Sequence, residues 1–391
     1  MSISDHARAN FQTLLRAANS GDLALMECTD VTTGEPRFVI CAVGRDHGEL
    51  VFTPVVAIAQ TAKPEATTTA LEVDEGRFVD INGMEQWITI RGAKRDNPVL
   101  LILHGGPGFP MSFLAPMYAE WEQKFTVVQW DQPATGATLL RQEGRSSGPL
   151  TIERYASDGI AVTEWLQRHL GQEKILLLGT SWGGILGVEM VQRRPDLYAG
   201  YIGAAQPVGS DGARRGYQMA LDAARSRGDA EAVTALERVG PPPYDNFEAF
   251  MVRQQYSNPP AVPATAGETR ASAEMLEIMM KPAPGARYNA ALPIPEGYDG
   301  GFMAAQQATW REAWSWEARD AGLTFQVPIY LFQGEVDMNT PTSAARDYFD
   351  EITAPRKVFE VVPGAGHTII LFHREILALL ERHVLAERPD A

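Results

Sequence analysis

Three residues that together could form a site with an activated hydroxyl group are spread along this 391-residue chain, and the first of them is Ser181. Ser181 stands in the pentapeptide GTSWG at 179–183, after a continuous apolar run and before a helix-like segment that Pro195 ends. A strand, this G-x-S-x-G turn and a helix in direct succession predict a serine held in strained geometry at the carboxyl edge of a sheet. We therefore interpret Ser181 as a nucleophile.

A serine hydroxyl is a poor nucleophile until a base takes its proton, and that base needs a third group to orient it. Asp337 and His367 each follow an apolar, strand-like run further along the chain. Carboxyl ends of parallel strands meet at one edge of a sheet, so both are predicted to reach the serine, His367 as base and Asp337 as orienting acid. Glu335 is the rival of Asp337, whereas His373 and His383 are expected on a helix surface.

A tetrahedral intermediate of acyl transfer also needs preorganised backbone donors for its oxyanion. One predicted donor is the amide of Trp182, directly after the serine at a helix N-terminus. The other is predicted in the segment HGGPG at 104–108, with Gly106 favoured over Gly105. His104 is interpreted as bracing this loop by hydrogen bonding rather than as a second base, and it is also a candidate for substrate contact.

The formal net charge of −15 narrows the range of partners. An acidic surface argues against nucleic acid and against anionic membranes. No uninterrupted apolar run is long enough to cross a bilayer, and the N-terminus lacks the charged start and apolar core of a signal peptide. We therefore expect a cytoplasmic location.

Two cysteines, Cys28 and Cys41, are too few for a disulfide framework or a four-thiolate metal site. Reduced thiols are the favoured interpretation, and a single bridge between neighbouring strands stays open. The glycines at 105–108 lack the spacing of a dinucleotide loop, and Pro107 would remove a phosphate-binding amide. We expect no metal and no cofactor.

The elements that must position these residues follow a pattern of strands alternating with helices over 71–205 and 324–391. This pattern predicts an α/β fold, with a mostly parallel sheet covered by helices on both faces. Residues 1–60 predict a small α+β N-terminal module, with one helix and a three-stranded antiparallel meander, and 61–70 has linker composition. The module is similar to a small uncharacterised bacterial domain that also occurs alone, which implies no function.

The alternation is interrupted over 206–323, which is rich in proline and has no strand-like run. We predict an inserted helical cap here. Its aromatic and methionine side chains are expected in part to roof the pocket and to make it apolar. Helices are expected at 212–227, 230–238, 246–256, 271–280 and 302–314.

The motifs together resemble the prolyl aminopeptidase (proline iminopeptidase) family of α/β hydrolases. They are HGGPG at 104–108, the Asp131-Gln132 pair, GTSWGG at 179–184, the G-x-x-D that ends at Asp337 and GAGH that ends at His367. The resemblance covers about 77–385. It implies the α/β-hydrolase fold with a helical cap and a serine hydrolase whose triad runs in the order Ser, Asp, His.

Two departures from the family pattern bear on the substrate. The family's DQRGxGxS is replaced here by DQPATGAT at 131–138. The family's cap glutamates, one in a W-x-x-W-E segment, hold the free amino group of the substrate. The nearest analogue lies at the end of the cap and leaves Trp316 and Glu317 as candidate substrate contacts. Without an anionic clamp, an apolar roof better suits a neutral ester, lactone or amide.

The predicted function is therefore a serine hydrolase that cleaves an ester, lactone or amide bond of a mainly hydrophobic small molecule through an acyl-enzyme intermediate. A peptide with an N-terminal proline is the alternative substrate. The alternative of another class is a non-catalytic binding protein that uses the pocket as a receptor. The N-terminal module is a candidate for homo-oligomerisation.

Overall fold

The computed structural model describes residues 23–29, 36–46, 49–58, 71–142, 148–259, 261–280 and 301–386. The chain divides into two compact units, Met1–Thr69 and Ala70–Ala391. The first unit contains an antiparallel sheet in the order β1-β2-β3, as the strand-like runs predict. Its strands are β1 (Leu23–Thr29), β2 (Pro36–Asp46) and β3 (Glu49–Ile58). The expected helix before this meander and the expected linker at 61–70 lie outside the described residues.

The register of this small sheet decides the question of a bridge between its two cysteines. Cys28 pairs with Arg37 on β2, while Cys41 pairs with Ala24 on β1. The two cysteines are thus offset by four residues, or about 13 Å along the strands at ~3.3 Å per residue. A disulfide requires Cα atoms less than about 7 Å apart. The register therefore excludes a bridge between Cys28 and Cys41 within the sheet.

The second unit is built on an eight-stranded sheet in the order β11-β10-β9-β8-β6-β7-β5-β4. Pairing is parallel from β11 to β7 and antiparallel from β7 through β5 to β4. The sheet is therefore mostly parallel, as predicted. Its strands are β4 (Val73–Ile81), β5 (Met84–Gly92), β6 (Val99–Leu103), β7 (Thr126–Asp131), β8 (Ile175–Thr180), β9 (Tyr198–Ala204), β10 (Ile329–Gly334) and β11 (Lys357–Val362).

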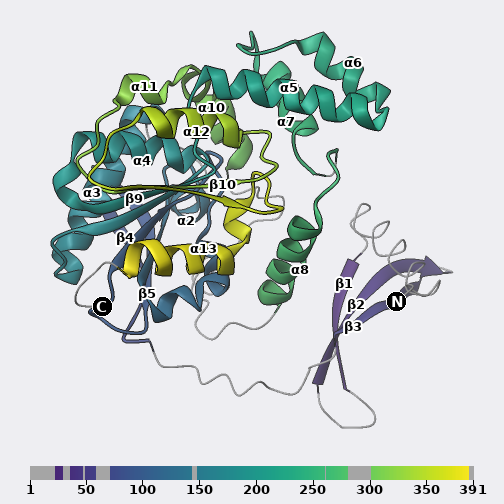
Figure 1. Ribbon diagram of the computed structural model, residues 1–391. Helices are drawn as coiled ribbons and strands as arrows, with labels where there is room; N and C mark the ends of the chain where they lie inside the picture. Colours follow the sequence, from purple (N-terminus) through teal and green to yellow (C-terminus); the bar gives the residue numbers. More distant parts are fainter. Residues whose placement is uncertain are drawn as a thin grey trace. The chain divides into compact units, whose positions relative to one another are not determined.

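Helices cover both faces of this sheet (Figure 1). One face packs against α3 (Ile152–Leu170), α4 (Trp182–Arg193) and α12 (Thr342–Glu351). The other packs against α13 (His373–Leu380) and the 3₁₀ segments η1 (Ser112–Tyr118) and η2 (Trp121–Gln123). Burial on both faces explains why the central strands read as unbroken apolar runs. Shorter pieces are α2 (Gly136–Arg141), η3 (Pro195–Leu197), η4 (Ile369–Leu371) and the π-helical η5 (Glu381–Leu385).

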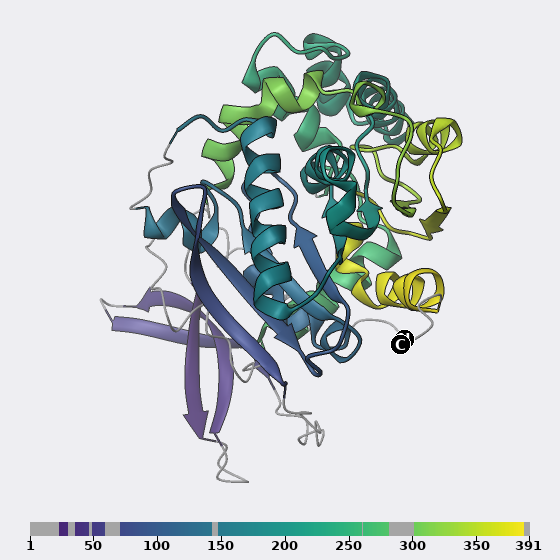
Figure 2. The ribbon, with the colours of Figure 1, turned by 90° about the vertical axis from the view of Figure 1, so that its left-hand side faces the viewer.

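The described part of the insertion between β9 and β10 is helical. Most of its helices lie at one end of the sheet, whereas α8 (Ala266–Met280) lies apart from them, beside η1 and η4 (Figure 1, Figure 2). Five helices of the insertion overlap the helices expected from the sequence. The cap helices are α5 (Ser210–Arg227), α6 (Ala230–Val239), α7 (Phe247–Tyr256), α8 (Ala266–Met280), α10 (Phe302–Ser315) and α11 (Ala318–Ala321). Within the described residues, no helix is long and apolar enough to cross a membrane.

Candidate active site

Ser181 occupies the turn between β8 and α4, with φ of 52° and ψ of −120°. A positive φ is costly for a residue with a side chain and needs support from its surroundings. The support comes from two glycines that pack without room for a side chain. A Cβ on Gly183 would lie 2.1 Å from the carbonyl oxygen of Leu103, and one on Gly179 would lie 2.2 Å from that of Gly183. Close packing therefore holds Ser181 at the sheet edge, where it lines a pocket.

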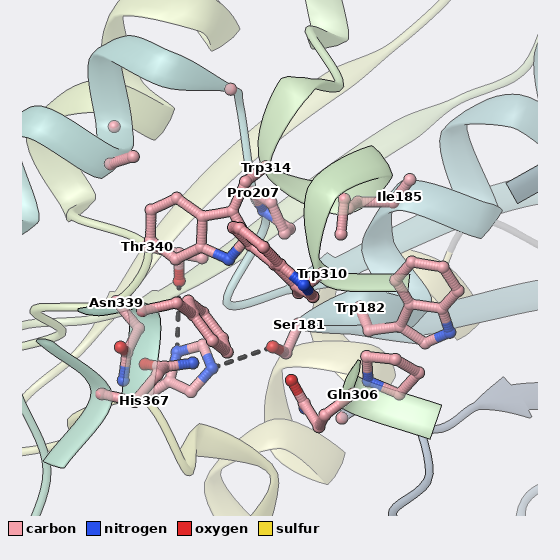
Figure 3. A pocket seen from close by; sticks show the side chains of 18 of the residues that line it. Ser181, Trp182, Ile185, Pro207, Gln306, Trp310, Trp314, Asn339, Thr340 and His367 are labelled. Carbon is pink, nitrogen blue, oxygen red and sulfur yellow. Dashed lines mark hydrogen bonds between the residues drawn. The ribbon is translucent and has the colours of Figure 1, made fainter. Parts of the chain in front are cut away.

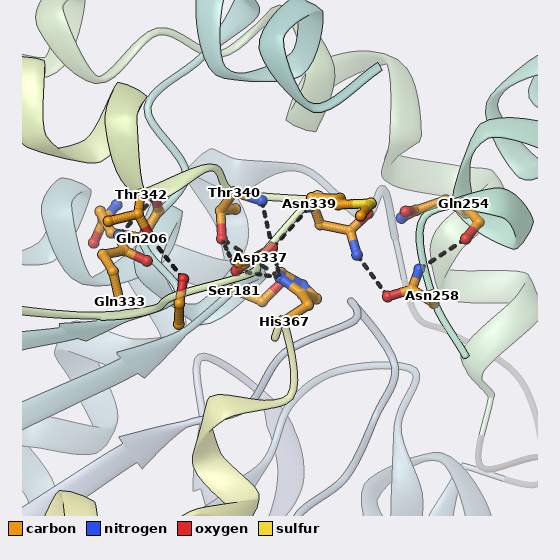
Figure 4. Close-up of polar contacts among 12 residues, drawn as sticks. Ser181, Gln206, Gln254, Asn258, Gln333, Asp337, Asn339, Thr340, Thr342 and His367 are labelled. Atoms are coloured by element: carbon orange, nitrogen blue, oxygen red, sulfur yellow. Dashed lines mark hydrogen bonds and ion pairs between the residues drawn. The ribbon is translucent and has the colours of Figure 1, made fainter. Parts of the chain in front are cut away.

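The three residues selected from the sequence come together at this edge, with Ser181 and His367 seen in Figure 3 and all three seen in Figure 4. Ser181 Oγ lies 2.8 Å from Nε2 of His367. On the other side of the ring, Nδ1 lies 3.0 Å from Oδ2 and 3.1 Å from Oδ1 of Asp337. An ionised carboxylate only accepts hydrogen bonds, so Nδ1 carries the proton and Nε2 faces the serine as an acceptor. The ring is thus oriented to take the proton of Ser181.

Asp337 is buried, with a relative exposure of 1%, and every contact of its carboxylate is with a donor (Figure 4). Oδ1 accepts from the amides of Asn339 (2.7 Å) and Thr340 (2.9 Å), and Oδ2 accepts from the hydroxyl of Thr340 (2.6 Å). Burial opposes ionisation, but the charge and hydrogen bond of His367 and the donors of Thr340 outweigh it and hold the pKa of Asp337 below its usual value. Asp337 is therefore an anion at neutral pH.

The rivals considered from the sequence lie elsewhere. Glu335 is exposed, and its carboxylate accepts from the amide of Gly364 at 2.8 Å. His383 pairs with Glu360 at 2.7 Å. The expectation that His373 lies on a helix surface is wrong, because its exposure is 2% and its ring nitrogen contacts the carbonyl of Leu371. It starts α13, where the helix packs against the sheet.

Two backbone amides, those of Trp182 and Gly106, are the candidate oxyanion donors. Trp182 is the first residue of α4, so its amide has no acceptor inside the helix. Gly106 lines the pocket together with Ser181 and Trp182, and its φ of 111° is one that glycine adopts readily. Gly105 packs against the turn that carries the serine, since a Cβ there would lie 3.2 Å from the carbonyl oxygen of Thr180 and 3.3 Å from Cβ of Ser181. Gly105 does not occur among the described residues that line the pocket.

His104 braces the loop that carries these glycines. Its Nδ1 donates to the carbonyl of Gly105 at 2.9 Å, and its Nε2 accepts from the amide of Gln132 at 3.3 Å. Burial lowers the pKa of His104 to about 4, only partly offset by the hydrogen bond to Gly105. The ring is therefore neutral and fully engaged. The side chain of Gln132 accepts from the indole of Trp182 at 3.1 Å, which ties this loop to the elbow.

The pocket above Ser181 lies between the sheet edge and the cap (Figure 3). Among the described residues that line it, none is an aspartate or a glutamate. Its polar lining comes from Arg253, Gln254, Gln306, Asn339 and Thr340 in addition to Ser181 and His367. Its apolar lining includes Ile185, Val208, Phe250, Trp310, Ala313 and Trp314.

The three residues suggested as substrate contacts have other partners. Glu317 accepts from the amide of Ser210 at 2.8 Å and so caps the start of α5. The indole of Trp316 donates to Glu189 of α4 at 2.8 Å. His104 is buried in the loop described above. None of the three occurs among the described lining residues of the pocket.

Sequence reasoning did not single out the polar residues of the cap that reach the pocket. Arg253 and Gln254 lie on α7, a helix whose position was predicted. No local pattern, however, indicates which face of this helix meets the loop after Asp337. The sequence feature that could have drawn attention to Arg253 is its position directly after a largely apolar stretch, FEAFMV at 247–252. Within the described part of the chain, no group of three or more His, Cys, Asp or Glu side chains is arranged to hold a metal ion.

Comparisons with known proteins bear on the family and the fold of this chain. A profile described as "Alpha/beta hydrolase family" matches residues 99–379, and one described as "Family of unknown function" matches residues 1–84. The probable aminopeptidase YbaC of Bacillus subtilis (strain 168) is 29% identical over 310 residues, which cover 78% of this chain and 94% of the relative. The proline iminopeptidase of Lactobacillus helveticus is 30% identical over 120 residues, which cover 30% of this chain and 38% of the relative.

Solved structures extend the comparison to the fold. The proline iminopeptidase-related protein of Thermus thermophilus aligns with a TM-score of 0.54 and 21% identity, covering 80% of this chain and 97% of the other. The proline iminopeptidase of Mycobacterium smegmatis aligns with a TM-score of 0.51 and 23% identity, covering 80% and 100%. At these identities the alignments show similarity of fold alone. Since the hydrolase profile matches well over half of its length, the chain belongs to the alpha/beta hydrolase family and is a prolyl aminopeptidase-like hydrolase.

Proposed function

We propose that this hydrolase cleaves an ester, lactone or amide bond of a mainly hydrophobic small molecule through an acyl-enzyme intermediate. The observation that carries the proposal is the continuous hydrogen-bonded line from Ser181 through His367 to Asp337. A hydroxyl, a correctly oriented imidazole and a buried carboxylate are the parts that acyl transfer to serine requires.

In the proposed reaction, Ser181 Oγ attacks the scissile carbonyl while Nε2 of His367 takes its proton. Asp337 keeps the proton of Nδ1 in place and stabilises the imidazolium that forms. The amides of Trp182 and Gly106 donate to the oxyanion. The intermediate then collapses, and the imidazolium gives its proton to the leaving group. Water, activated by the same imidazole, releases the acyl group and restores the serine.

The lining of the pocket supports a substrate that lacks a free amino group. A peptide with an N-terminal proline carries a cationic amine, which needs a carboxylate or a set of acceptors once it is removed from water. No carboxylate occurs among the described lining residues, and Arg253 places a positive charge in the wall. Aromatic side chains such as Trp310 and Trp314 instead offer apolar surface to an acyl chain.

Prolyl aminopeptidase activity is the second candidate, and the names of the similar proteins favour it. The two candidates separate when hydrolysis of proline p-nitroanilide is compared with hydrolysis of p-nitrophenyl butyrate by the same preparation. We expect the ester to be the better substrate by kcat/KM. A marked preference for the proline anilide would assign the aminopeptidase function instead.

The catalytic role of Ser181 is tested by Ser181→Ala. The variant should lose at least about 10⁴-fold in kcat, because the remaining groups cannot supply a nucleophile. It should also fail to react with a fluorophosphonate probe that labels the wild-type protein. Wild-type turnover by the variant would refute the assignment, and a wild-type protein that neither labels nor turns over would favour the non-catalytic receptor.

Four further predictions come from composition and sequence pattern, and the geometry of the site does not bear on them. They are the cytoplasmic location, the lack of nucleic acid or membrane partners and the domain limits at 1–60, 61–70, 71–205 with 324–391, and 206–323. Homo-oligomerisation through the N-terminal module is the fourth. Deletion of residues 1–60 should reduce the mass in solution to that of one protomer if that module mediates assembly.

A further inference from the structure

Arg253 is a cation buried in the wall of the active-site pocket. It lies on α7 with a relative exposure of 0%. Burial lowers its pKa to about 10, with the nearby hydroxyl of Tyr244 and the charge of Asp337 opposing that effect, so it stays protonated at neutral pH. A buried cation is costly unless its charge is compensated.

Within the described part of the chain, all the hydrogen-bond acceptors of Arg253 are uncharged. Its guanidinium donates to the carbonyl of Met338 at 2.6 Å, to Oδ1 of Asn339 at 2.5 Å and to Oε1 of Gln254 at 3.1 Å. Its Nε is buried without a partner. The guanidinium of Arg253 is therefore hydrogen-bonded only to dipoles and lies over the ring of Trp314, and the charge of Asp337 acts on it without a hydrogen bond between them.

Arg253 also decides which way the two amide side chains around it point. A guanidinium has only donors, so the amides of Gln254 and Asn339 must turn their oxygens toward it. The amino group of Asn339 then donates to Oδ1 of Asn258 at 2.7 Å, and Asn258 donates to the carbonyl of Gln254 (Figure 4). The amino group of Gln254 is turned away from Arg253. Its side chain lines the pocket, and no acceptor for Nε2 is found among the described residues.

The pocket thus combines a donor group and a positive charge at one place. Gln254 offers N–H bonds, and the charge of Arg253 lies directly behind the amide that carries them. No carboxylate balances this charge from among the described lining residues, and the surroundings include the aromatic rings of Phe250 and Trp314. Beside a buried cation and apolar rings, an anion gains more from the nearby charge than it would in bulk water.

We propose that the pocket selects substrates whose acyl chain ends in a carboxylate, and that Gln254 Nε2 donates a hydrogen bond to that carboxylate with the charge of Arg253 behind it. The inference rests on the proposed function, since it assigns the acyl group of the same reaction. It makes Gln254 a specificity-determining residue and Arg253 a positioning residue that orients its amide.

Binding to the Ser181→Ala protein tests the inference without requiring turnover. The probes are mono-p-nitrophenyl glutarate and its uncharged, near-isosteric counterpart, p-nitrophenyl 5-methylhexanoate, with Kd measured from quenching of tryptophan fluorescence. The carboxylate ester should bind about 10- to 100-fold more tightly, which is the usual effect of a hydrogen bond to a charged group.

Substitutions at position 254 should change the ratio of the two Kd values. In the Ser181→Ala background, Gln254→Leu should bring the ratio to within about threefold of one, and Gln254→Glu should invert it by charge repulsion. Gln255→Leu is the matched control, because Gln255 is the exposed neighbour on the same helix, and it should leave the ratio at its original value.

The inference is overturned if the glutarate ester binds no more tightly than the neutral ester. It is equally overturned if the ratio survives Gln254→Leu and Gln254→Glu, since Arg253 would then serve only to join α7 to the loop after Asp337. Failure of the proposed function would be seen separately, as absence of ester turnover and of phosphonate labelling in the wild-type protein.

Discussion

Replacement of Asp337 by asparagine changes one atom and should reverse the proton arrangement of the site. Oδ1 accepts from the backbone amides of Asn339 and Thr340, which cannot turn away, so the oxygen of Asp337→Asn must stay there. The new amino group then occupies the position of Oδ2 and faces Nδ1 of His367. The hydroxyl of Thr340 can rotate to accept from it. A proton on Nδ1 would point at this amino group, which is nearer (3.0 Å) than Oδ1 (3.1 Å), and Oδ1 already accepts from two amides. We therefore expect the ring to carry its proton on Nε2, pointing at Ser181.

The size of the effect follows from these contacts. With the proton on Nε2, 2.8 Å from Ser181 Oγ, the imidazole cannot accept the proton of the serine. The negative charge that would stabilise the imidazolium is also gone. A trapped tautomer of this kind costs roughly 10³- to 10⁴-fold in kcat, or about 4 to 5.5 kcal/mol in the barrier. Binding should change little, because Asp337 does not occur among the described lining residues.

The assay is hydrolysis of p-nitrophenyl butyrate under saturating substrate, with the rate of fluorophosphonate labelling as a second readout. The matched control is Glu335→Gln, which removes the charge of the nearby exposed carboxylate and should stay within about threefold of wild type. Near-normal kcat in Asp337→Asn would refute the tautomer argument. A large loss confined to Glu335→Gln would instead identify Glu335 as the orienting acid.

Two predictions concern stability. In Gly183→Ala the new Cβ would lie 2.1 Å from the carbonyl oxygen of Leu103. The melting temperature should therefore fall by several degrees, or the protein should fail to fold. In the control Gly200→Ala, the new Cβ has no contact below 3.4 Å, and the melting temperature should change little. Burial lowers the pKa of His104 to about 4, so unfolding takes up a proton in acid. The neutral ring of His104 therefore contributes about 3 kcal/mol to the free energy of unfolding. This contribution is complete above pH 6.5 and is lost as the pH falls toward 4. The urea midpoint of His104→Gln should therefore fall less than that of wild type between pH 7.5 and 4.5; an equal fall would contradict this.

The residues of the candidate site could be selected from the sequence because their signals are local. The turn at Ser181 is defined by a buried strand, two glycines without space for a side chain and a helix, all within about twenty residues. Asp337 and His367 follow strands of a parallel sheet, and the pairing of such strands brings their ends together whatever the intervening chain does. The cap helices were predicted for a related reason, since proline and helical periodicity are also local features.

Features that depend on packing between distant segments were not predicted. The π-helical turn η5 that follows α13 was not expected from the sequence. Trp316 and Glu317 were suggested as substrate contacts, yet they bind Glu189 and the amide of Ser210. A side chain's partner across more than a hundred residues is set by how elements dock, and sequence patterns along one element carry little of that information.

What the sequence determined by itself is the set of candidate reactive groups, the mostly parallel sheet that brings them to one edge and the helical character of the described insertion. What only the tertiary structure decided is the character of the pocket. The face that α7 turns toward the loop after Asp337 depends on how this helix packs against Met338 and Asn339. That docking buries Arg253, orients Gln254 and leaves no carboxylate among the described lining residues. The proposed chemistry thus rests on short-range pattern, and the proposed selectivity rests on long-range packing.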